Sequence, residues 1–394
     1  CKYLYNNLSF NEFEELANSV INRKLNKNFK SFAPGRDKGI DLIYDKKKLK
    51  IVVQVKHYLN STFSNLKSQM EKEKKKMDKI VPDRYILFTS MSLTVNQNDV
   101  IKSIMDGYIK SKHDIISREN IDNLLSSEKY KNIVKSNFKL WLSNIDILEN
   151  IMNNAQNTNK KYFLENIKDE LELYVQTNFF NKALDILRNK SFILMYGRPG
   201  VGKTVISRLL IMDYLSRNYE LKTIVGNNIK ELEEILSIDP NKKEIIFVDD
   251  FLGTNFLDLK DYSSESRISN LIKKYKGLSN KVLVISSRVT ILKKAFIKYE
   301  KINNLKKYIY NNSLKINNYN KVEKAKIFYN HCYFKLLRKK PKYFKKIVEN
   351  RNYLKIIEHR NYNPRIIDHI TKKSFIESIS ANEYIKLILI NIIY

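Results

Sequence analysis

The sequence predicts an α/β protein in which two sheet-containing domains precede a C-terminal helical region. Two observations predict it. Short apolar runs alternate with amphipathic stretches on both sides of the Asn-rich segment 150–161, which is typical of strands that alternate with helices. In addition, five of the nine glycines fall into two clusters, at 35–39 and 197–202, and so mark two places where the backbone turns sharply.

The first half of the chain predicts a domain in which strands and helices alternate, an α/β pattern. Helices are expected over 10–25 and about 62–79, and strands over 40–45, 49–56 and 85–89. The turn Lys46–Lys48 separates the first two strands, and further helices continue to Trp141. We therefore predict a first domain at 1–145 and a linker at 146–165.

The second half predicts a parallel sheet covered by helices on both faces. Strands are expected over 192–196, 223–225, 245–248 and 282–286, with a helix over 205–214. Short apolar strands bounded by helices are typical of parallel sheets. From about residue 295 the pattern is helical to the end. We therefore predict a sheet domain at 166–295 and a helical region at 296–394.

The chain of 394 residues is strongly basic, with 72 Lys and Arg against 42 Asp and Glu, a net charge of +30. Such a balance favours a polyanionic partner, usually nucleic acid. A compositional bias is the alternative, because the chain is rich in Lys, Asn, Ile and Tyr throughout. The basic runs 46–48, 72–76 and 338–346 could line a DNA path, but each is equally a solvated helix face or turn.

The remaining composition excludes several classes of protein. Cys1 and Cys332 cannot form a disulfide framework, and the five His residues form no zinc pattern, so a reducing cytoplasm is expected. The longest apolar run, 387–394, is shorter than the roughly 20 residues that cross a bilayer, so no membrane span is predicted. Because the chain begins at Cys1 rather than Met, it stays open whether residues are missing at either end.

A phosphate-binding motif lies between the predicted strand 192–196 and the following helix. Residues 197–204 read G-R-P-G-V-G-K-T and match G-x-x-x-x-G-K-[ST] in full. Backbone N–H groups around Gly197, Gly200 and Gly202 can wrap a β-phosphate. Lys203 would reach the β- and γ-phosphates, and Thr204 would hold Mg²⁺. ATP and Mg²⁺ are therefore the expected cofactors.

Two further strand ends support this site. Asp249 and Asp250 follow the apolar run 245–248. Asp249 would hold Mg²⁺ through water, and Asp250 could orient or deprotonate the attacking water. The next strand ends in Ser286-Ser287-Arg288, a polar tip that could sense the γ-phosphate; a surface turn is an equal alternative.

The paired acids and the Ser-Ser-Arg tip resemble those of STAND NTPases. The segments 174–187, 325–331 and 360–365 extend the resemblance over roughly 160–370, to the third class of novel STAND domains. Members usually serve as ATP-gated switches in prokaryotic antiviral defence, which implies oligomerisation. The resemblance also implies an adenine contact for Pro364, although Pro364 equally suits the start of a helix. A long C-terminal sensor is usual in the family, and little follows residue 375 here, so a phage-derived trigger or a separate sensor protein is expected.

A second constellation lies in the first domain. Asp41 follows Gly39, and Gln54 and Lys56 lie thirteen and fifteen residues further on. Alternate strand residues share a face, so a hairpin would bring Asp41 beside Gln54 and Lys56. Such a set can hold Mg²⁺ and activate water for attack on a phosphodiester, with Lys56 stabilising the transition state. Glu14 on the preceding helix is a further candidate acid, although a solvated role is the commoner alternative.

The segments 35–42 and 52–56 resemble Mrr-like restriction endonucleases of the PD-(D/E)xK fold, over about residues 10–90. The resemblance implies a restriction-endonuclease-like α/β/α domain with Asp41, Gln54 and Lys56 in its active site. Gln54 stands where many nucleases of this fold have Asp or Glu, a replacement that occurs within the Mrr-like branch. Activity is therefore not excluded, but the replacement lowers the negative charge around the metal and leaves Asp41 as the one sure carboxylate.

Three functional hypotheses follow. The first is a Mg²⁺-dependent DNA endonuclease of antiphage defence that is gated by ATP and oligomerisation. The second is an ATP-driven restriction or repair nuclease that moves along DNA, against which no helicase motif beyond the P-loop is visible. The third is a non-catalytic regulator that only binds nucleic acid.

Overall fold

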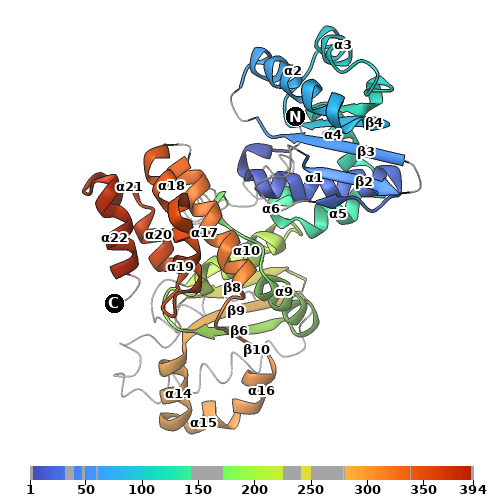
Figure 1. Cartoon of the computed structure of the whole chain (residues 1–394). Coiled ribbons are helices and arrows are strands. Elements are labelled where there is room, and N and C mark those ends of the chain that lie inside the picture. The colour runs from blue at the N-terminus through green and yellow to red at the C-terminus, as the bar shows by residue number, and fades with distance from the viewer. Residues whose placement is uncertain are drawn as a thin grey trace. The chain divides into compact units, whose positions relative to one another are not determined.

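The computed structural model describes residues 3–31, 40–46, 49–58, 61–142, 172–224, 241–249, 278, 280–337 and 339–391. Most of its helices and strands are labelled in Figure 1. The chain divides into two compact units, residues 1–147 and residues 148–394. The expected linker 146–165 lies outside the described residues.

Unit 1 contains a five-stranded sheet in the order β1-β2-β3-β4-β5. Its strands are β1 (Lys30–Ser31), β2 (Leu42–Lys46), β3 (Leu49–Lys56), β4 (Arg84–Thr89) and β5 (Ile115–Ile116). The first three run antiparallel, and β3, β4 and β5 run parallel. The expected hairpin is therefore present, although its first strand begins two residues later than expected.

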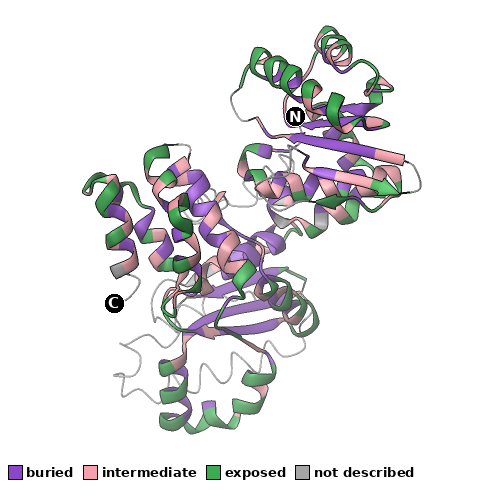
Figure 2. Ribbon diagram, viewed as in Figure 1, coloured by how far each residue is buried: buried purple, intermediate pink, exposed green. Residues whose placement is uncertain are grey.

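Helices cover both faces of this sheet. They are α1 (Phe10–Leu25), α2 (Phe63–Ile80), α3 (Val95–Ile104), α4 (Arg118–Ser126), α5 (Lys131–Ser136) and α6 (Phe138–Leu142). Ile51, Val53 and Val55 of β3 pack with α1, whereas Val52 packs with α2. This alternation buries both faces of β3 (Figure 2) and confirms the α/β/α arrangement.

The helical segment after β4 belongs to the same unit. Lys139 of α6 is buried and its Nζ atom lies 2.9 Å from Oε2 of Glu12 on α1. Glu12 also accepts a hydrogen bond from the backbone N–H of Ser9, which caps α1. One carboxylate therefore stabilises both the start of α1 and the return of the chain to it.

Unit 2 contains a five-stranded, all-parallel sheet in the order β10-β6-β9-β8-β7. Its strands are β6 (Phe192–Gly197), β7 (Glu220–Ile224), β8 (Glu244–Val248), β9 (Lys281–Arg288) and β10 (Ser313–Ile316). Helix α10 (Lys203–Leu215) contacts β6, β7, β8 and β9, and α9 (Asn178–Lys190) contacts β6 and β10. The helices α14 (Val289–Lys298), α15 (Glu300–Asn304) and α16 (Lys306–Asn311) bury their apolar side chains against the opposite face.

Strand β10 corrects the expectation that the chain is helical from about residue 295. It pairs with β6 through residues 313–316, so the sheet continues beyond the expected domain end at 295. The strand has four residues and one neighbour, and only Ile316 is fully buried. So short an edge strand has no periodicity that distinguishes it from the ends of neighbouring helices.

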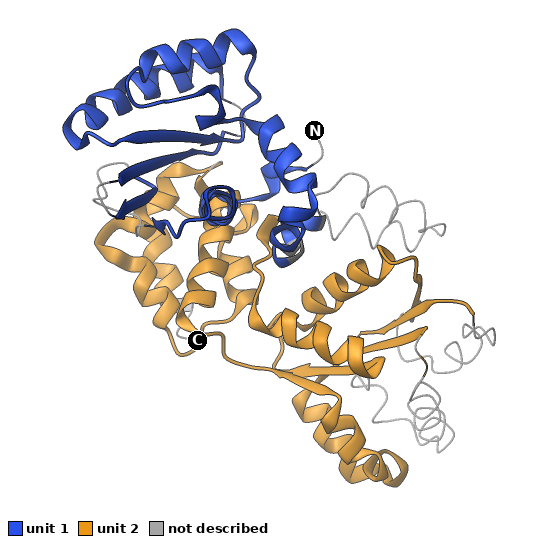
Figure 3. Ribbon diagram, turned by 90° about the vertical axis from the view of Figure 1, so that its right-hand side faces the viewer, with its two compact units in different colours: residues 1–147 blue, residues 148–394 orange. Residues whose placement is uncertain are grey.

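The remainder of unit 2 is helical, as expected. It contains α17 (Lys321–His331), a π-helical turn at Cys332–Leu337, α18 (Pro341–Val348), α19 (Asn352–Glu358), α20 (Pro364–Ile370), α21 (Lys373–Glu377) and α22 (Ala381–Asn391). These helices share an apolar core that includes Phe328, Ile356, Ile367 and Tyr384. Figure 3 shows this unit in orange. We call residues 317–391 the lid. Among the described residues, no helix is long and apolar enough to span a membrane.

Candidate active sites

The predicted phosphate-binding loop connects β6 to α10. At each of its three glycines, the backbone conformation or a close neighbour disfavours a side chain. Gly200 and Gly202 have φ angles of +79° and +91°, which strain any residue with a side chain. Gly197 lies against the end of β10, where a Cβ atom would collide with the carbonyl oxygen of Ile316. Helix α10 begins at Lys203, so its first N–H groups face the loop.

The polar side chains expected around a nucleotide converge at this loop. Nζ of Lys203 donates to the carbonyl oxygens of Gly197 and Arg198, at 3.2 and 3.0 Å. Oγ1 of Thr204 lies 3.3 Å from both carboxylate oxygens of Asp249, the residue after β8. The loop and the end of β8 thus meet, and the binding of Mg²⁺ by Thr204 and Asp249 stays a prediction.

The order of the strands explains the position of the Ser-Ser-Arg tip. Because β9 lies between β6 and β8, its end lies between the loop and Asp249. Oγ of Ser286 donates to Oδ1 of Asp249 at 2.5 Å, and Arg288 pairs in register with Gly197. A γ-phosphate contact by Arg288 stays a prediction. Asp250 lies outside the described residues.

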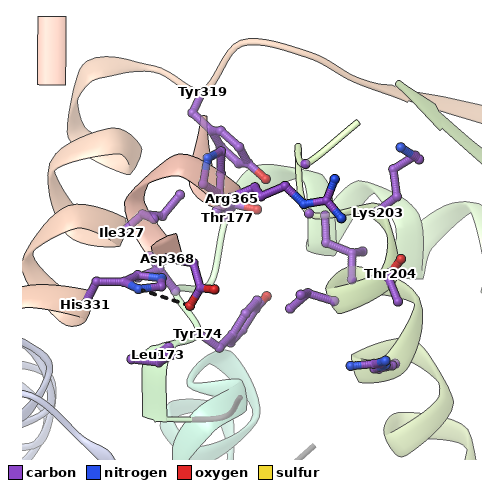
Figure 4. A pocket seen from close by; sticks show the side chains of 17 residues that line it. Leu173, Tyr174, Thr177, Lys203, Thr204, Tyr319, Ile327, His331, Arg365 and Asp368 are labelled. Carbon is purple, nitrogen blue, oxygen red and sulfur yellow. Dashed lines mark ion pairs between the residues drawn. The ribbon is translucent and has the colours of Figure 1, made fainter. Parts of the chain in front are cut away.

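A pocket of about 450 Å³ opens beside the loop, within unit 2 (Figure 4). It is lined by Gly200, Gly202, Lys203, Thr204, Val205, Ile206 and Arg208 of the loop and α10, by Leu173, Tyr174, Val175 and Thr177, and by Tyr319, Ile327, His331, Pro364, Arg365 and Asp368 of the lid. Its size suits a nucleotide. Pro364 lines this pocket and lies at the first turn of α20, as its role in starting a helix predicts, whereas its contact with adenine stays a prediction.

The lid contacts the phosphate-binding loop directly. Nδ2 of Asn363 donates to the carbonyl oxygen of Pro199 at 3.0 Å, and the hydroxyl of Tyr319 donates to that of Val201 at 2.7 Å. A Cβ atom on Gly200 would lie 2.6 Å from Oδ1 of Asn363. Burial raises the pKa of Tyr319 well above its usual range, so its hydroxyl stays a donor.

The pocket wall formed by α17 and α20 contains the neutral imidazole ring of His331 and the carboxylate of Asp368, which pairs with Lys335. Burial lowers the pKa of His331 to about 3, with Lys335 acting in the same sense and Asp368 against it. Nδ1 of His331 lies 3.9 Å from Oδ1 of Asp368, which also accepts from Nζ of Lys335 at 2.6 Å. Arg365 extends across the pocket toward the side of Lys203 and Thr204 (Figure 4).

In unit 1 the hairpin brings Asp41 and Gln54 together as predicted. Leu42 of β2 pairs with Val53 of β3, which places Asp41 beside Gln54. Oδ2 of Asp41 accepts from Nε2 of Gln54 and from the backbone N–H of Val55, each at 2.6 Å. This arrangement leaves Oε1 of Gln54 buried and without a hydrogen-bond partner among the described residues.

Lys56 lies at the end of β3 and, by alternation, on the same face as Gln54. Its Nζ atom is 3.9 Å from Oε1 of Glu73, a buried residue of α2. Glu73 is not among the site residues predicted from the sequence, although it lies on the apolar stripe of α2 with Leu66, Met70 and Met77. A single acid on an apolar stripe is the signal that could have identified it.

Glu14 lies on α1, which packs against the face of β3 opposite to Gln54. Its side chain is half-buried. Strand alternation therefore turns Gln54 and Lys56 toward α2 rather than toward the helix that carries Glu14. A role for Glu14 in the site stays a prediction.

The described residues contain no group of three or more His, Cys, Asp and Glu side chains that could hold a metal ion. Amide oxygens are therefore further candidate ligands for a divalent cation in unit 1. The unpartnered Oε1 of Gln54, beside the Asp41 carboxylate, fits that role, because hard cations bind carboxylate and amide oxygens.

Two family models match the chain in the order that these sites suggest. Residues 5–85 match the restriction endonuclease family, and residues 174–334 match novel STAND NTPase 3. The chain joins a restriction endonuclease domain to a novel STAND NTPase domain. The first match covers the hairpin with Asp41, Gln54 and Lys56. The second covers the phosphate-binding loop and ends before Pro364, so α20 lies beyond it.

Individual proteins share shorter or more distant similarity with this nuclease–STAND fusion. The uncharacterized protein y4cD of Sinorhizobium fredii is 35% identical over 154 residues, which is 39% of this chain. The matched part spans 24% of that protein's length.

Three solved structures resemble parts of the chain. The RuvB Holliday junction branch migration motor of Thermotoga maritima has a TM-score of 0.36 at 15% identity, over 56% of this chain and 70% of that one. PCH-2 of C. elegans has a TM-score of 0.32 at 14% identity, over 62% of this chain and 71% of that one. NtrX of Brucella abortus, solved in complex with ADP, has a TM-score of 0.32 at 11% identity, over 83% of this chain and 70% of that one.

Proposed function

We propose that the chain is a Mg²⁺-dependent DNA endonuclease of prokaryotic antiphage defence, gated by ATP in its STAND domain. The observation that carries the proposal is the joint presence of two assembled sites: Asp41, Gln54 and Lys56 on one hairpin, and the phosphate-binding loop with Asp249 under a lid. DNA as the substrate is supported by the endonuclease family and by the net charge of +30. The cytoplasm is the expected compartment.

In the endonuclease domain, Asp41 and Oε1 of Gln54 would hold Mg²⁺. Bound there, the ion would lower the pKa of a water molecule and polarise the scissile phosphate. Lys56, on the same face, would donate to a phosphate oxygen as negative charge develops. The hydrogen bond from Gln54 to Asp41 sets the orientation of both side chains before the substrate arrives.

In the STAND domain, Lys203 would exchange its two carbonyl acceptors for the β- and γ-phosphates of ATP. Thr204 and Asp249 already lie together and would hold the accompanying Mg²⁺. Asp250 would orient the attacking water. Pro364, Tyr174 and Ile327 line the apolar part of the pocket, where the base would lie.

Gating is supported by the contacts of the lid with the same loop. Asn363 and Tyr319 hydrogen-bond the carbonyl oxygens of Pro199 and Val201, on either side of Gly200. A nucleotide that enters this loop therefore changes the environment of the lid. We propose that ATP binding, together with a phage-derived trigger or a separate sensor protein, favours a homo-oligomer in which the endonuclease domain cuts.

The test is plasmid cleavage by the full chain with Mg²⁺ and ATP, in the presence of lysate from phage-infected cells, which supplies the trigger. Asp41→Ala, Lys56→Ala and Lys203→Ala are compared with Lys190→Ala, which removes an exposed lysine at the end of α9. We expect cleavage by the wild type and by Lys190→Ala alone. Cleavage that survives Lys203→Ala would exclude ATP gating, and cleavage that survives Asp41→Ala would exclude this active site.

A non-catalytic regulator is the second candidate function, favoured by Gln54 in place of a carboxylate. It predicts DNA binding by the wild type without cleavage, even when lysate from phage-infected cells supplies the trigger. Fast ATP hydrolysis stimulated by DNA would instead favour the nuclease that moves along DNA.

A further inference from the structure

Four buried oxygen atoms on one face of the unit 1 sheet have no hydrogen-bond partner among the described residues. They are Oε1 of Gln54, the hydroxyl of Tyr58, Oε2 of Glu73 and the hydroxyl of Tyr85. They come from β3, the segment after it, α2 and β4. Buried polar atoms in proteins nearly always have a partner, so four of them on one face of the sheet make that face a candidate site for a polar ligand.

Register and electrostatics place these atoms in one cluster. Tyr85 pairs with Val52, two residues from Gln54 on the same face of the sheet. Burial, and then the Glu73 carboxylate, raise the pKa of both Tyr58 and Tyr85, and Asp41 adds to the effect at Tyr85. Asp41, whose carboxylate Gln54 contacts, therefore lies within electrostatic range of Tyr85.

Glu73 is the unusual member, because an ionised side chain is rarely buried without full pairing. Its side chain is 7% exposed and lies on the apolar stripe of α2. Oε1 receives a hydrogen bond from Lys76 at 2.9 Å and lies 3.9 Å from Nζ of Lys56, which leaves Oε2 for another partner. Packing alone does not explain an acid here, where a Leu or Met would fill the stripe.

We propose that Glu73 supplies the second carboxylate of the endonuclease metal site, which Gln54 cannot supply. The ion would be held by Asp41, by Oε1 of Gln54 and by Oε2 of Glu73, and the hydroxyls of Tyr58 and Tyr85 would bind its water molecules. Two carboxylates and one amide oxygen match the preference of Mg²⁺ and Mn²⁺ for oxygen ligands. This inference rests on the proposed endonuclease function. It adds a metal ligand from helix α2 to the two ligands on the β2–β3 hairpin.

An alternative role for Glu73 is to position Lys56 through their ion pair. In that case Glu73→Gln would lower cleavage but leave metal affinity unchanged. Metal binding, rather than cleavage, therefore discriminates between the two roles.

The experiment titrates Mn²⁺ into the full chain without nucleotide, with free Mn²⁺ measured by electron paramagnetic resonance. Asp41→Ala defines the binding that belongs to this site. Glu73→Gln is compared with Glu71→Gln, an exposed acid two residues away on the same helix. We expect Glu73→Gln to weaken the binding by about tenfold or more, and Glu71→Gln to leave it unchanged. Adding Gln54→Glu to Glu73→Gln should restore it.

Wild-type affinity in Glu73→Gln, beside lost affinity in Asp41→Ala, would overturn the role of Glu73 and leave the proposed endonuclease intact. Absence of Mn²⁺ binding by the wild type would also overturn it, whereas the endonuclease proposal is judged separately by plasmid cleavage.

If the Glu73→Gln protein does not fold, a second measurement on the wild type tests the same proposal. Fe²⁺ bound in place of Mg²⁺, with ascorbate and peroxide, generates hydroxyl radicals that cut nearby backbone. We expect Mg²⁺-protected cuts near both residue 41 and residue 73. Cuts near residue 41 alone would overturn the proposal.

Discussion

His331 illustrates, at the scale of a residue, how burial sets a protonation state in the nucleotide pocket. Its folded-state pKa of about 3 lies below the ordinary value of about 6.5 for an unfolded chain. As pH falls through 6.5, the unfolded chain takes up a proton that the folded chain does not. The stability contributed by neutral His331 is therefore full above about pH 6.5 and is lost progressively below it.

We expect the free energy of unfolding to fall between pH 7 and pH 4, by up to about 1.4 kcal/mol per pH unit from this residue. His331→Gln should flatten that dependence, because glutamine does not titrate. His369→Gln removes an exposed histidine of α20 and serves as the control. Urea unfolding followed by circular dichroism at several pH values measures it. Equal slopes for the wild type and His331→Gln would contradict the account.

Helix α20 shows, at the scale of an element, how one side chain links the lid to the phosphate-binding loop. Asn363 accepts a hydrogen bond from the backbone N–H of Arg365 and so caps α20, while its amide group donates to Pro199. We expect Asn363→Ala to destabilise the lid by about 1 kcal/mol and to accelerate ADP release several-fold.

Asn320→Ala is the matched control, because Asn320 caps α17 of the same lid in the same way. Release of a fluorescent ADP analogue in stopped flow compares the two variants. Equal acceleration by both would mean that lid stability in general, rather than the loop contact, controls release.

Strands β8 and β9 are joined by a buried ion pair as well as by their ladder. Glu244 pairs in register with Lys281, their carboxylate and ammonium groups lie 2.5 Å apart, and both side chains are at most 5% exposed. Lys281→Met should destabilise the STAND domain by about 3–5 kcal/mol, because it leaves a buried carboxylate unpaired. The double variant Glu244→Leu, Lys281→Met should recover most of that loss.

Lys222→Met provides the comparison, since Lys222 pairs with Glu220 in a more exposed ion pair on β7. There the expected change is about 0–1 kcal/mol. Chemical denaturation of the full chain measures all three variants. A Lys281→Met protein as stable as Lys222→Met would refute the assignment of a buried, coupled pair.

At the scale of the whole molecule, the net charge of +30 predicts strongly salt-dependent DNA binding. If the chain contacts six or more phosphates, its affinity should fall by about a thousandfold or more between 50 and 200 mM salt. Fluorescence anisotropy with a labelled duplex and Asp41→Ala, which is not expected to cut, measures the slope. An affinity independent of salt would mean that the lysine content reflects composition rather than a DNA surface.

The features that could be predicted from the sequence are those that depend on residues close together along the chain. The phosphate-binding loop needs glycines at Gly200 and Gly202 because their φ angles are positive, and a strand and a helix flank it within a few residues. The meeting of Asp41 with Gln54 follows from strand alternation across one short turn.

Tertiary structure alone decided the contacts between distant segments. Glu73 approaches Lys56 only because α2 packs on the face of β3 that carries Gln54, and Tyr319 reaches Val201 across 118 residues of sequence. Likewise, β10 becomes a strand because the edge of β6 offers unpaired backbone groups. Local periodicity is insensitive to such partners, because the free energy that selects them comes from burial and pairing with residues far along the chain.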